Sequence, residues 1–378
     1  MKSHKYIIMI SVLCLVVVFS LGCGEPAGWQ EPFPERLTIS VMDSIGIEMG
    51  DSCYVLGAIA DAEVSPSGTI LLLDQSACCI REFAPDGIHL ANLSRRGSGP
   101  GEFLCPFEMA IMPDGRIMVA DMHKQSIIVL SETGESIEDM SDWPLFVPTS
   151  ITPLGENLFA GCEMKYDMTD TEMLIIIKPS LFSLGDASSE YSFFSDTLRF
   201  NLDGSDVAIS SVDGLTGVTL LTSDEDGRVF YSRKSSSEGV VHCWNIGADS
   251  LFTASPGFPP AAKTEQEILD ETEYTRMQFA ALGLNALPEG FEPDPFHVMV
   301  ENTGVDSDGN LWVQRGTEEK PVFDIFDTAG DHIGTAEFPG TGKQWQFSIS
   351  PYGSLAWNND PLSGVQKVYM VKLPVISF

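Results

Sequence analysis

A glycine-centred segment recurs six times along the chain, and this repeat limits the folds that the sequence can adopt. Each copy has an apolar residue, a short turn and then a second apolar run, and the copies align without a gap. The column glycines are Gly68, Gly115, Gly155, Gly227, Gly309 and Gly353, and Pro66, Pro113, Pro153 and Pro351 precede four of them by two places. Proline presets one backbone angle and glycine accepts the positive φ of a tight turn. Each copy therefore predicts a β-hairpin.

A second glycine turn follows the first at a nearly constant distance. Gly87 and Gly134 each lie 19 residues after their column glycine, and Gly330 lies 21 residues after its own. Each unit then contains three or four short strands joined by tight turns, which is the antiparallel meander of a propeller blade. The sequence predicts an all-β fold, a six-bladed β-propeller that spans residues 36–378.

Two segments resemble known propeller repeats. Arg95–Glu135, with its Gly-Ser-Gly-Pro-Gly-Glu-Phe lead-in, resembles a repeat of the NHL type, and Val305–Gly334 resembles a late blade of six-bladed propeller lipoproteins. The first segment departs from the NHL pattern at Lys124 and Ser126, where Asn and Arg are common. The resemblance implies the fold and leaves the function open, because propellers of this kind have many roles.

The spacing between the column glycines is uneven and locates the insertions. The gaps are 47, 40, 72, 82 and 44 residues long. The 72-residue gap predicts long hairpins around residues 174–177 and 191–202. The 82-residue gap contains a predicted helix, Glu265–Leu282, whose start has the capping box Thr264–Glu267 and whose end has Gly283. We expect a helical insertion at about residues 261–284, between blades 4 and 5.

The N-terminal residues read as an export segment. Residues 1–22 combine Lys2 and Lys5 with a following apolar run, which is typical of a signal peptide. Residues 19–23 resemble the lipobox of bacterial lipoproteins, with Ser20 where Leu is commonest, which implies lipidation of Cys23. Ordinary cleavage and an uncleaved anchor are the alternatives. Residues 23–35 form a tether, and a strand near residues 37–41 is expected to close the ring by pairing with the last blade. The predicted location is the cell envelope, as a periplasmic or outer-membrane lipoprotein.

The chain is strongly acidic. It has 21 basic and 54 acidic residues, a net charge of −33, and loss of Lys2 and Lys5 with the signal would bring this to −35. A phosphate backbone would be repelled, so nucleic acid is not an expected partner. The charge favours either cations and basic partners or a solvated acidic coat without a specific role.

The cysteines give no metal-binding pattern. Without Cys14 and Cys23 six remain, at irregular spacings that contain no paired Cys-x-x-Cys: Cys53, Cys78, Cys79, Cys105, Cys162 and Cys243. An exported protein can oxidise such residues, but buried free thiols are the simpler expectation.

Polar residues follow the second strand of several copies and define the candidate site. We expect them on the face that also carries the links between blades and the helical insertion, where binding usually resides. The candidate binding ring consists of Asp74, Asp121, His123, Arg233, Arg315 and Asn359. These side chains would either hold a polar ligand near the central channel or pair with one another to satisfy the strand ends.

No motif identifies a reaction. The glycine-rich lead-in lacks the Gly-Lys-Ser/Thr of a phosphate loop, and no nucleophile elbow occurs. The preferred prediction is a non-catalytic binding or scaffold module for a protein, peptide or glycan, without a cofactor. The alternative is a metal-dependent propeller enzyme, similar to lactonases and lyases, that acts at the central channel with a divalent cation.

Overall fold

The computed structural model describes most of the chain from residue 32 onward. The described residues are 32–33, 35–143, 146–169, 172–201, 219–281, 292–316, 320–341, 345–358 and 365–376. The chain divides into two units, Met1–Pro34 and Glu35–Phe378, and every strand belongs to the second. Predictions for residues 1–31, which include the signal segment and Cys23, lie outside the described residues.

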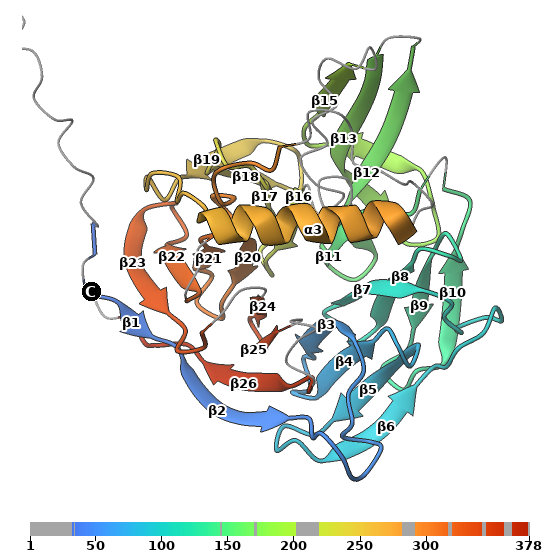
Figure 1. Cartoon of the computed structure of the whole chain (residues 1–378). Helices are drawn as coiled ribbons and strands as arrows, with labels where there is room; N and C mark the ends of the chain where they lie inside the picture. The colour runs from blue at the N-terminus through green and yellow to red at the C-terminus, as the bar shows by residue number, and fades with distance from the viewer. Residues whose placement is uncertain are drawn as a thin grey trace, which may run out of the picture. The chain divides into compact units, whose positions relative to one another are not determined.

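The described strands of the second unit form six sheets, which are antiparallel except for the pairing of β1 (Leu37–Thr38) with β23 (His332–Glu337) (Figure 1). The first sheet contains β3 (Ile59–Val64), β4 (Ile70–Asp74), β5 (Cys79–Phe83) and β6 (His89–Leu93). The second contains β7 (Pro106–Ile111), β8 (Ile117–Asp121), β9 (Ser126–Leu130) and β10 (Ser136–Met140). The third contains β11 (Thr149–Pro153), β12 (Leu158–Met168), β13 (Glu172–Ser183), β14 (Ser189–Ser192) and β15 (Asp196–Asn201). The long β12–β13 hairpin and the strands β14 and β15 confirm the insertion predicted after the third column glycine.

The other three sheets complete the ring. The fourth sheet contains β16 (Thr219–Ser223), β17 (Arg228–Arg233), β18 (Val241–Asn245) and β19 (Ser250–Ala254). The fifth contains β20 (Asn302–Val305), β21 (Leu311–Gln314), β22 (Val322–Phe326) and β23 (His332–Glu337). The sixth contains β24 (Trp345–Ser350), β25 (Gly353–Asn358) and β26 (Val368–Lys372). The inner strands β3, β7, β11, β16, β20 and β24 contact one another in this order, and β24 also contacts β3. The predicted six-bladed propeller is therefore confirmed.

The N-terminal strands close the ring, as the sequence predicted. β1 (Leu37–Thr38) pairs in parallel with β23, and β2 (Ser40–Ile45) pairs antiparallel with β26. β2 thus supplies the outer strand of the blade whose other strands come from the C-terminal end of the sequence. Pairing of this kind removes the open edge that an incomplete last blade would leave.

The column glycines form the predicted turns in five of the six copies. Gly68, Gly115, Gly155, Gly227 and Gly309 have φ values between 77° and 96°, a range that side-chain-bearing residues rarely adopt. Gly353 is different, because it is the first residue of β25 and is not among the positive-φ residues. A Cβ atom there would lie 2.9 Å from Val64 Cγ2. The prediction of a positive φ was wrong at Gly353, where close packing between blades requires glycine instead.

The predicted helix is α3 (Glu265–Ala281), and it crosses one face of the ring (Figure 1). Its capping box is present: the Thr264 N–H donates to Glu267 Oε2 at 2.6 Å, and the Glu267 N–H donates to Thr264 Oγ1 at 3.3 Å. Gly283, the predicted end, lies outside the described residues. Within the described part of the chain, no helix is both long and apolar enough to cross a membrane.

The position of α3 in the blade order corrects the sequence prediction. The helix lies between the β16–β19 sheet and the β20–β23 sheet. The prediction placed it between blades 4 and 5 because it counted from the first column glycine. The ring begins one blade earlier, since β2 belongs to the closing sheet, so the helix lies between blades 5 and 6.

The core is formed between neighbouring blades. One cluster joins Leu71 and Leu73 of β4 to Val119 of β8, and another joins Phe323 of β22 to Phe347 of β24. The fully buried aromatic residues belong to such clusters. Each blade is thus held by its two neighbours, which leaves the two faces of the ring and the channel for polar groups.

Candidate functional site

The aspartates that end the second strands hold the chain where it enters their own blade. Asp74 accepts hydrogen bonds from the N–H groups of Gly57 (3.0 Å) and Ala77 (2.9 Å) and from Arg81 Nε (2.8 Å). Its side chain is fully buried. Gly57 precedes β3, so Asp74 ties the incoming chain to the end of β4. These contacts use both carboxylate oxygens inside the blade.

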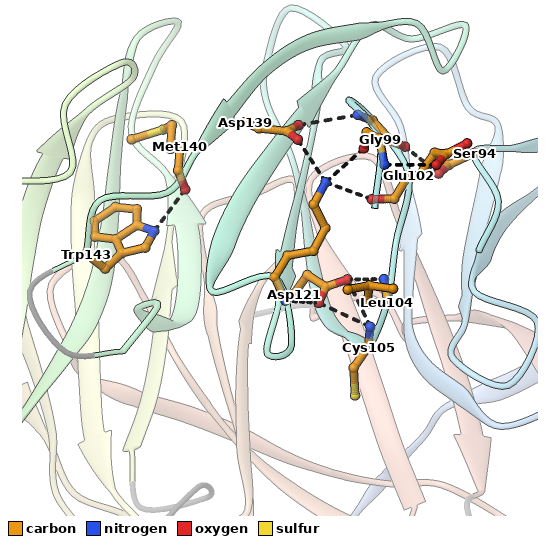
Figure 2. A network of polar contacts seen from close by, with 11 residues as sticks. Ser94, Gly99, Glu102, Leu104, Cys105, Asp121, Asp139, Met140 and Trp143 are labelled. Carbon is orange, nitrogen blue, oxygen red and sulfur yellow. Dashed lines mark hydrogen bonds and ion pairs between the residues drawn. The ribbon is translucent and has the colours of Figure 1, made fainter. Parts of the chain in front are cut away.

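Asp121 has the same role one blade later, as Figure 2 shows. Its carboxylate accepts hydrogen bonds from the N–H groups of Leu104 (2.7 Å to Oδ2) and Cys105 (3.0 Å to Oδ2) on the link before β7. The N–H groups of His123 and Lys124 also donate to Oδ1, at 3.0 and 2.9 Å. The buried Asp121 side chain therefore orders two loops at once.

The glycine-rich lead-in, residues 97–103, is fixed by one lysine. Lys124 Nζ donates to the carbonyl oxygens of Gly99 (3.1 Å) and Glu102 (3.0 Å) and contacts Asp139 Oδ2 at 2.8 Å (Figure 2). The Gly99 N–H donates to Glu102 Oε2 at 2.9 Å. Lys124 is the residue at which the sequence departed from the NHL pattern, and here it binds the loop between two blades.

Arg315 forms a buried ion pair. Its Nε and Nη2 atoms bind the two oxygens of Asp324 at 2.7 and 2.6 Å, and the side chains are 5% and 0% exposed. His332 Nε2 lies 3.0 Å from Asp324 Oδ1. The Arg315 guanidinium also lies over the Phe258 ring, 4.8 Å from its centroid. This arrangement binds two strands of one blade to the link that carries α3.

The remaining residues of the candidate ring differ in their surroundings. His123 is exposed, Asn359 lies outside the described residues, and Arg233 is half-buried at the end of β17. The structure thus distributes the predicted ring over separate local networks. Arg233 is the member that lines a described cavity.

That cavity lies at the seam between the third and fourth sheets in chain order. It has a volume of about 80 Å³ and is lined by Phe194, Tyr231, Arg233, Glu238, Val240 and His242. Phe194 comes from the connector between β14 and β15, whereas Tyr231 and Arg233 are on β17 and His242 is on β18. By the same measure, a water molecule needs about 10–15 Å³, so the cavity holds several waters or part of a small ring. We refer to it as the seam pocket.

A group of stacked aromatic rings forms part of the seam pocket and continues next to it. The Phe194 ring stacks on His242 with centroids 6.1 Å apart and an interplanar angle of 18°. His242 in turn stacks on Trp244 at 5.6 Å and 15°. Tyr231 lies 5.8 Å from Phe194 at a tilt of 45°. Phe194 is 40% exposed, so the stack carries an aromatic ring that is open to solvent.

The loop that carries Glu238 and Val240 is tied to the segment after α3. The Met299 N–H donates to the Ser235 carbonyl oxygen at 2.8 Å, and Lys234 Nζ contacts Glu301 Oε1 at 2.8 Å. Ser236 Oγ also binds the Asp294 carboxylate. These contacts hold the rim of the seam pocket against the helical insertion, on the face where the sequence predicted binding.

A second polar region follows the inner strands around the channel. Asp61 on β3 accepts a hydrogen bond from the Met109 N–H of β7 at 2.9 Å. Glu108 on β7 accepts from the N–H groups of Ser150 (2.8 Å) and Ile151 (2.6 Å) of β11. In the fifth sheet, Asn302 on β20 donates to the Phe347 carbonyl oxygen of β24 at 2.6 Å. We call these residues the inner belt, because each one reaches the inner strand of the next blade.

The sequence contained a signal for the inner belt that the ring prediction did not use. Asp61, Glu108 and Asn302 each lie seven places before their column glycines, in strands that are otherwise largely apolar. A polar column within apolar strands indicates side chains with a shared partner, which here is the free backbone edge of the neighbouring inner strand.

The belt acids are held in an environment that favours their protonated forms. Burial raises the pKa of Glu108 to about 8; the nearby Asp61 charge adds to this rise, and the hydrogen bonds from Ser150 and Ile151 oppose it. Burial also raises the pKa of Asp61 and of Glu63, and Glu63 accepts a hydrogen bond from Ser348 Oγ at 2.8 Å. These groups hold protons at pH values at which ordinary carboxyls have lost them.

Thiols and metal-ligating groups are dispersed in the described part of the chain. Cys53, Cys78, Cys79, Cys105, Cys162 and Cys243 are all free thiols, and burial raises the pKa of Cys243 to about 12. Among the residues that the structure describes, no three His, Cys, Asp or Glu side chains gather in a group that could hold a metal ion.

Comparisons with known proteins support the fold. No protein-family model and no curated protein sequence matches the chain. A member of the DUF4221 family from Bacteroides vulgatus is similar in structure, with a TM-score of 0.51 and 8% sequence identity over 89% of this chain and 98% of that one. At this identity the likeness concerns the fold alone.

Two further solved structures match less closely. A protein from Bacteroides fragilis, whose name marks it as a candidate exported protein, has a TM-score of 0.48 and 13% identity over 89% of this chain and 96% of its own. A streptogramin B lyase has a TM-score of 0.43 and 11% identity over 88% of this chain and 87% of its own. Neither of these proteins assigns a role to the seam pocket or the inner belt.

Proposed function

We propose that the chain is an exported, lipid-anchored β-propeller that binds a protein, peptide or glycan of the cell envelope without catalysing a reaction on it. The seam pocket is the observation that carries this proposal. It combines an exposed aromatic ring with Arg233 and Glu238 on the face with the long insertions. A concave site with apolar walls and a few convergent polar groups is the usual form of a binding site.

The polar networks favour binding at the seam pocket over binding at the predicted ring. The carboxylates of Asp74 and Asp121 already accept several hydrogen bonds from their own loops, and Arg315 is paired with Asp324. A ligand at those positions would have to break contacts that hold the blades together. The seam pocket is instead a concave site whose wall includes the exposed ring of Phe194.

Ligand-dependent thermal unfolding tests this proposal. A ligand that binds the folded state alone raises the melting temperature. We expect a polysaccharide or protein fraction of the cell envelope to raise the Tm of the full-length protein, and Arg233→Ala to remove the rise. Arg116→Ala, which alters an exposed turn contact, should keep it. A Tm that no envelope fraction changes would reject the proposed binding function.

The proposed anchor is tested separately. Cys23→Ser removes the thiol that lipidation requires, so we expect the variant to leave the membrane fraction and appear in the soluble envelope fraction. Continued retention of the variant in the membrane fraction would indicate an uncleaved N-terminal helix instead.

The metal-dependent enzyme is the second candidate, although the acidic side chains of the inner strands do not gather in a metal-binding group among the described residues. Asp61, Glu63 and Glu108 place three carboxyl groups on two adjacent inner strands. Elemental analysis of the purified full-length protein decides the matter. A stoichiometric divalent ion that is lost in Asp61→Asn would support the enzyme, and absence of such an ion would reject it.

A further inference from the structure

We infer that the seam pocket is a saccharide site, and that it takes the ring of a neutral sugar. This inference rests on the proposed binding function and specifies its ligand class. It depends on four features: the exposed aromatic ring of the pocket, its pair of oppositely charged side chains, the pairing of β17 and β18 on both sides, and the charge of the whole chain.

The exposed ring of Phe194 is a platform with a fixed orientation. The ring is 40% exposed, while the stacked His242 and Trp244 rings lie next to it at centroid distances of 6.1 and 6.2 Å. One face of a sugar ring presents a patch of C–H groups, and these pack well on an aromatic face. Because neighbouring rings support the platform, little conformational entropy is lost when a ligand stacks on it.

The polar rim offers both donors and acceptors at one place. Arg233 provides a planar group of N–H donors and Glu238 provides carboxylate acceptors, while His242 can serve as either. Neighbouring hydroxyl groups on a sugar also donate and accept, so two adjacent hydroxyls match a guanidinium and a carboxylate together. A ligand of a single charge would match one of these groups and be repelled by the other.

The walls of the seam pocket do not suit an extended peptide. β17 pairs with β16 and β18, and β18 pairs with β17 and β19, so both wall strands have partners on each side. A peptide that binds as an added strand needs an unpaired edge.

The overall charge selects against acidic sugars. With a net charge of −33, the protein repels uronates, sialylated glycans and other anionic saccharides before they reach the pocket. A neutral sugar avoids this long-range repulsion. The ligand class is therefore a neutral hexopyranoside or the exposed end of a neutral glycan.

Saturation-transfer NMR with simple glycosides tests the inference. The ligands are methyl glucoside, galactoside, mannoside and N-acetylglucosaminide, with methyl glucuronide as the anionic control. They are added to the full-length protein in a detergent without a sugar headgroup. We expect saturation of the ring protons of at least one neutral glycoside and weaker saturation of the glucuronide, with less difference between them at high salt.

Two variants assign the signal to the pocket. Phe194→Ala should weaken binding by about two- to tenfold, since aromatic packing contributes about 0.5–1.5 kcal/mol beyond area burial. Phe194→Trp should restore binding because it keeps the platform. Phe296→Ala is the matched control, because Phe296 is 41% exposed but does not line the pocket; its binding should equal that of the unaltered chain. An equal loss in the two alanine variants would overturn the assignment.

A parallel panel of tripeptides separates failure of this inference from failure of the proposed function. Saturation of a tripeptide, with none of any neutral glycoside and with loss in Phe194→Ala, would show a peptide site: the sugar assignment would fall and the binding function would remain. If neither panel is saturated, the saccharide inference is rejected, and the envelope-fraction melting experiment decides the binding function alone.

Discussion

Arg315 and Asp324 place two opposite charges where water is nearly absent. Two short hydrogen bonds and the Phe258 ring surround the guanidinium, and the two side chains are 5% and 0% exposed. The free energy needed to remove such a pair from water offsets much of its Coulomb attraction. Removing one partner alone, however, leaves an uncompensated charge in the interior. At the residue scale, the structure thus depends on the pair as a unit.

Asp324→Ala should reduce the free energy of unfolding by about 3–5 kcal/mol, because it leaves the Arg315 charge buried without its carboxylate. Asp114→Ala removes a more exposed pair with Arg116, whose side chains are 33% and 22% exposed, and should cost less than about 1 kcal/mol. Urea unfolding of both variants measures the difference. Equal losses of unfolding free energy in the two variants would show that the buried pair contributes no more to stability than the more exposed pair.

Single residues were the least predictable level of the site. Arg315 was predicted as a ligand-binding residue because it follows a strand. Its partner Asp324 comes from the next strand, and no sequence spacing predicts that these two side chains pair. Arg233 was among the predicted candidates and lines the seam pocket. Phe194 was not among them, because the connector that places it beside β17 belongs to a different blade. Contacts across the seam depend on blade packing, which a repeat pattern does not encode.

The links between blades are ordered by side chains from the strands they join. Asp74 and Asp121 bind the chain that enters their own blades, and Lys124 binds the carbonyl groups of Gly99 and Glu102. At the scale of elements, the glycine-rich lead-in is therefore a structural link rather than a ligand loop. Its glycines permit a compact path, and the lysine fixes that path.

Lys124→Met should loosen the lead-in without unfolding the ring. It leaves the Gly99 and Glu102 carbonyl groups and the Asp139 carboxylate without this donor, at a cost of about 1–3 kcal/mol. We expect faster amide hydrogen exchange in residues 97–103, measured by mass spectrometry. Lys165→Met, at a lysine that is 50% exposed, is the control. Unchanged exchange in the lead-in would contradict the role of Lys124.

Elements were well predicted where local chemistry decides them. The turns at five column glycines, the capping box of α3 and the long hairpins between the third and fourth copies followed from turn residues, side-chain caps and gap lengths. Gly353 departed from its column because its constraint is contact with Val64 in another blade. Rules for local turns and caps therefore predicted the elements correctly, except where contact with a neighbouring blade determines the residue.

The inner belt, together with Glu63, joins neighbouring blades at four of the six junctions between inner strands. Asp61 reaches β7, Glu108 reaches β11, Asn302 reaches β24, and the Ser348 hydroxyl of β24 donates to Glu63 of β3. The contacts satisfy backbone groups at the free edges of inner strands. Their cost is burial of carboxyl groups whose pKa values are raised, so the stability of the ring is linked to pH.

The sign of this linkage follows from the direction of the shifts. A carboxyl whose pKa is higher in the folded than in the unfolded protein binds its proton more tightly when folded. Stability is then retained below the unfolded pKa of 4.5 and lost as the pH rises toward about 8, the values for Glu63 and Glu108. Reduced self-repulsion of the acidic chain at low pH acts in the same direction.

Glu63→Gln should make stability less dependent on pH between about 4.5 and 8, because glutamine does not ionise and its oxygen can still accept the Ser348 hydrogen bond. Urea midpoints at pH 5.5, 6.5, 7.5 and 8.5 measure the slope. Glu265→Gln, at an exposed residue of α3, has the same charge change and controls for self-repulsion. Identical slopes in the two variants would contradict a role for Glu63.

Closure of the ring by β2 and β26 has a consequence for how the protein is made. Residues 40–45 leave the ribosome long before residues 368–372, yet each needs the other to complete a sheet. Until then the partly folded chain carries an unpaired strand, which is prone to association with other chains. Pairing over so long a sequence distance also slows folding. We therefore expect folding of this protein to depend on chaperones that shield the open ring until its last strands have been synthesised.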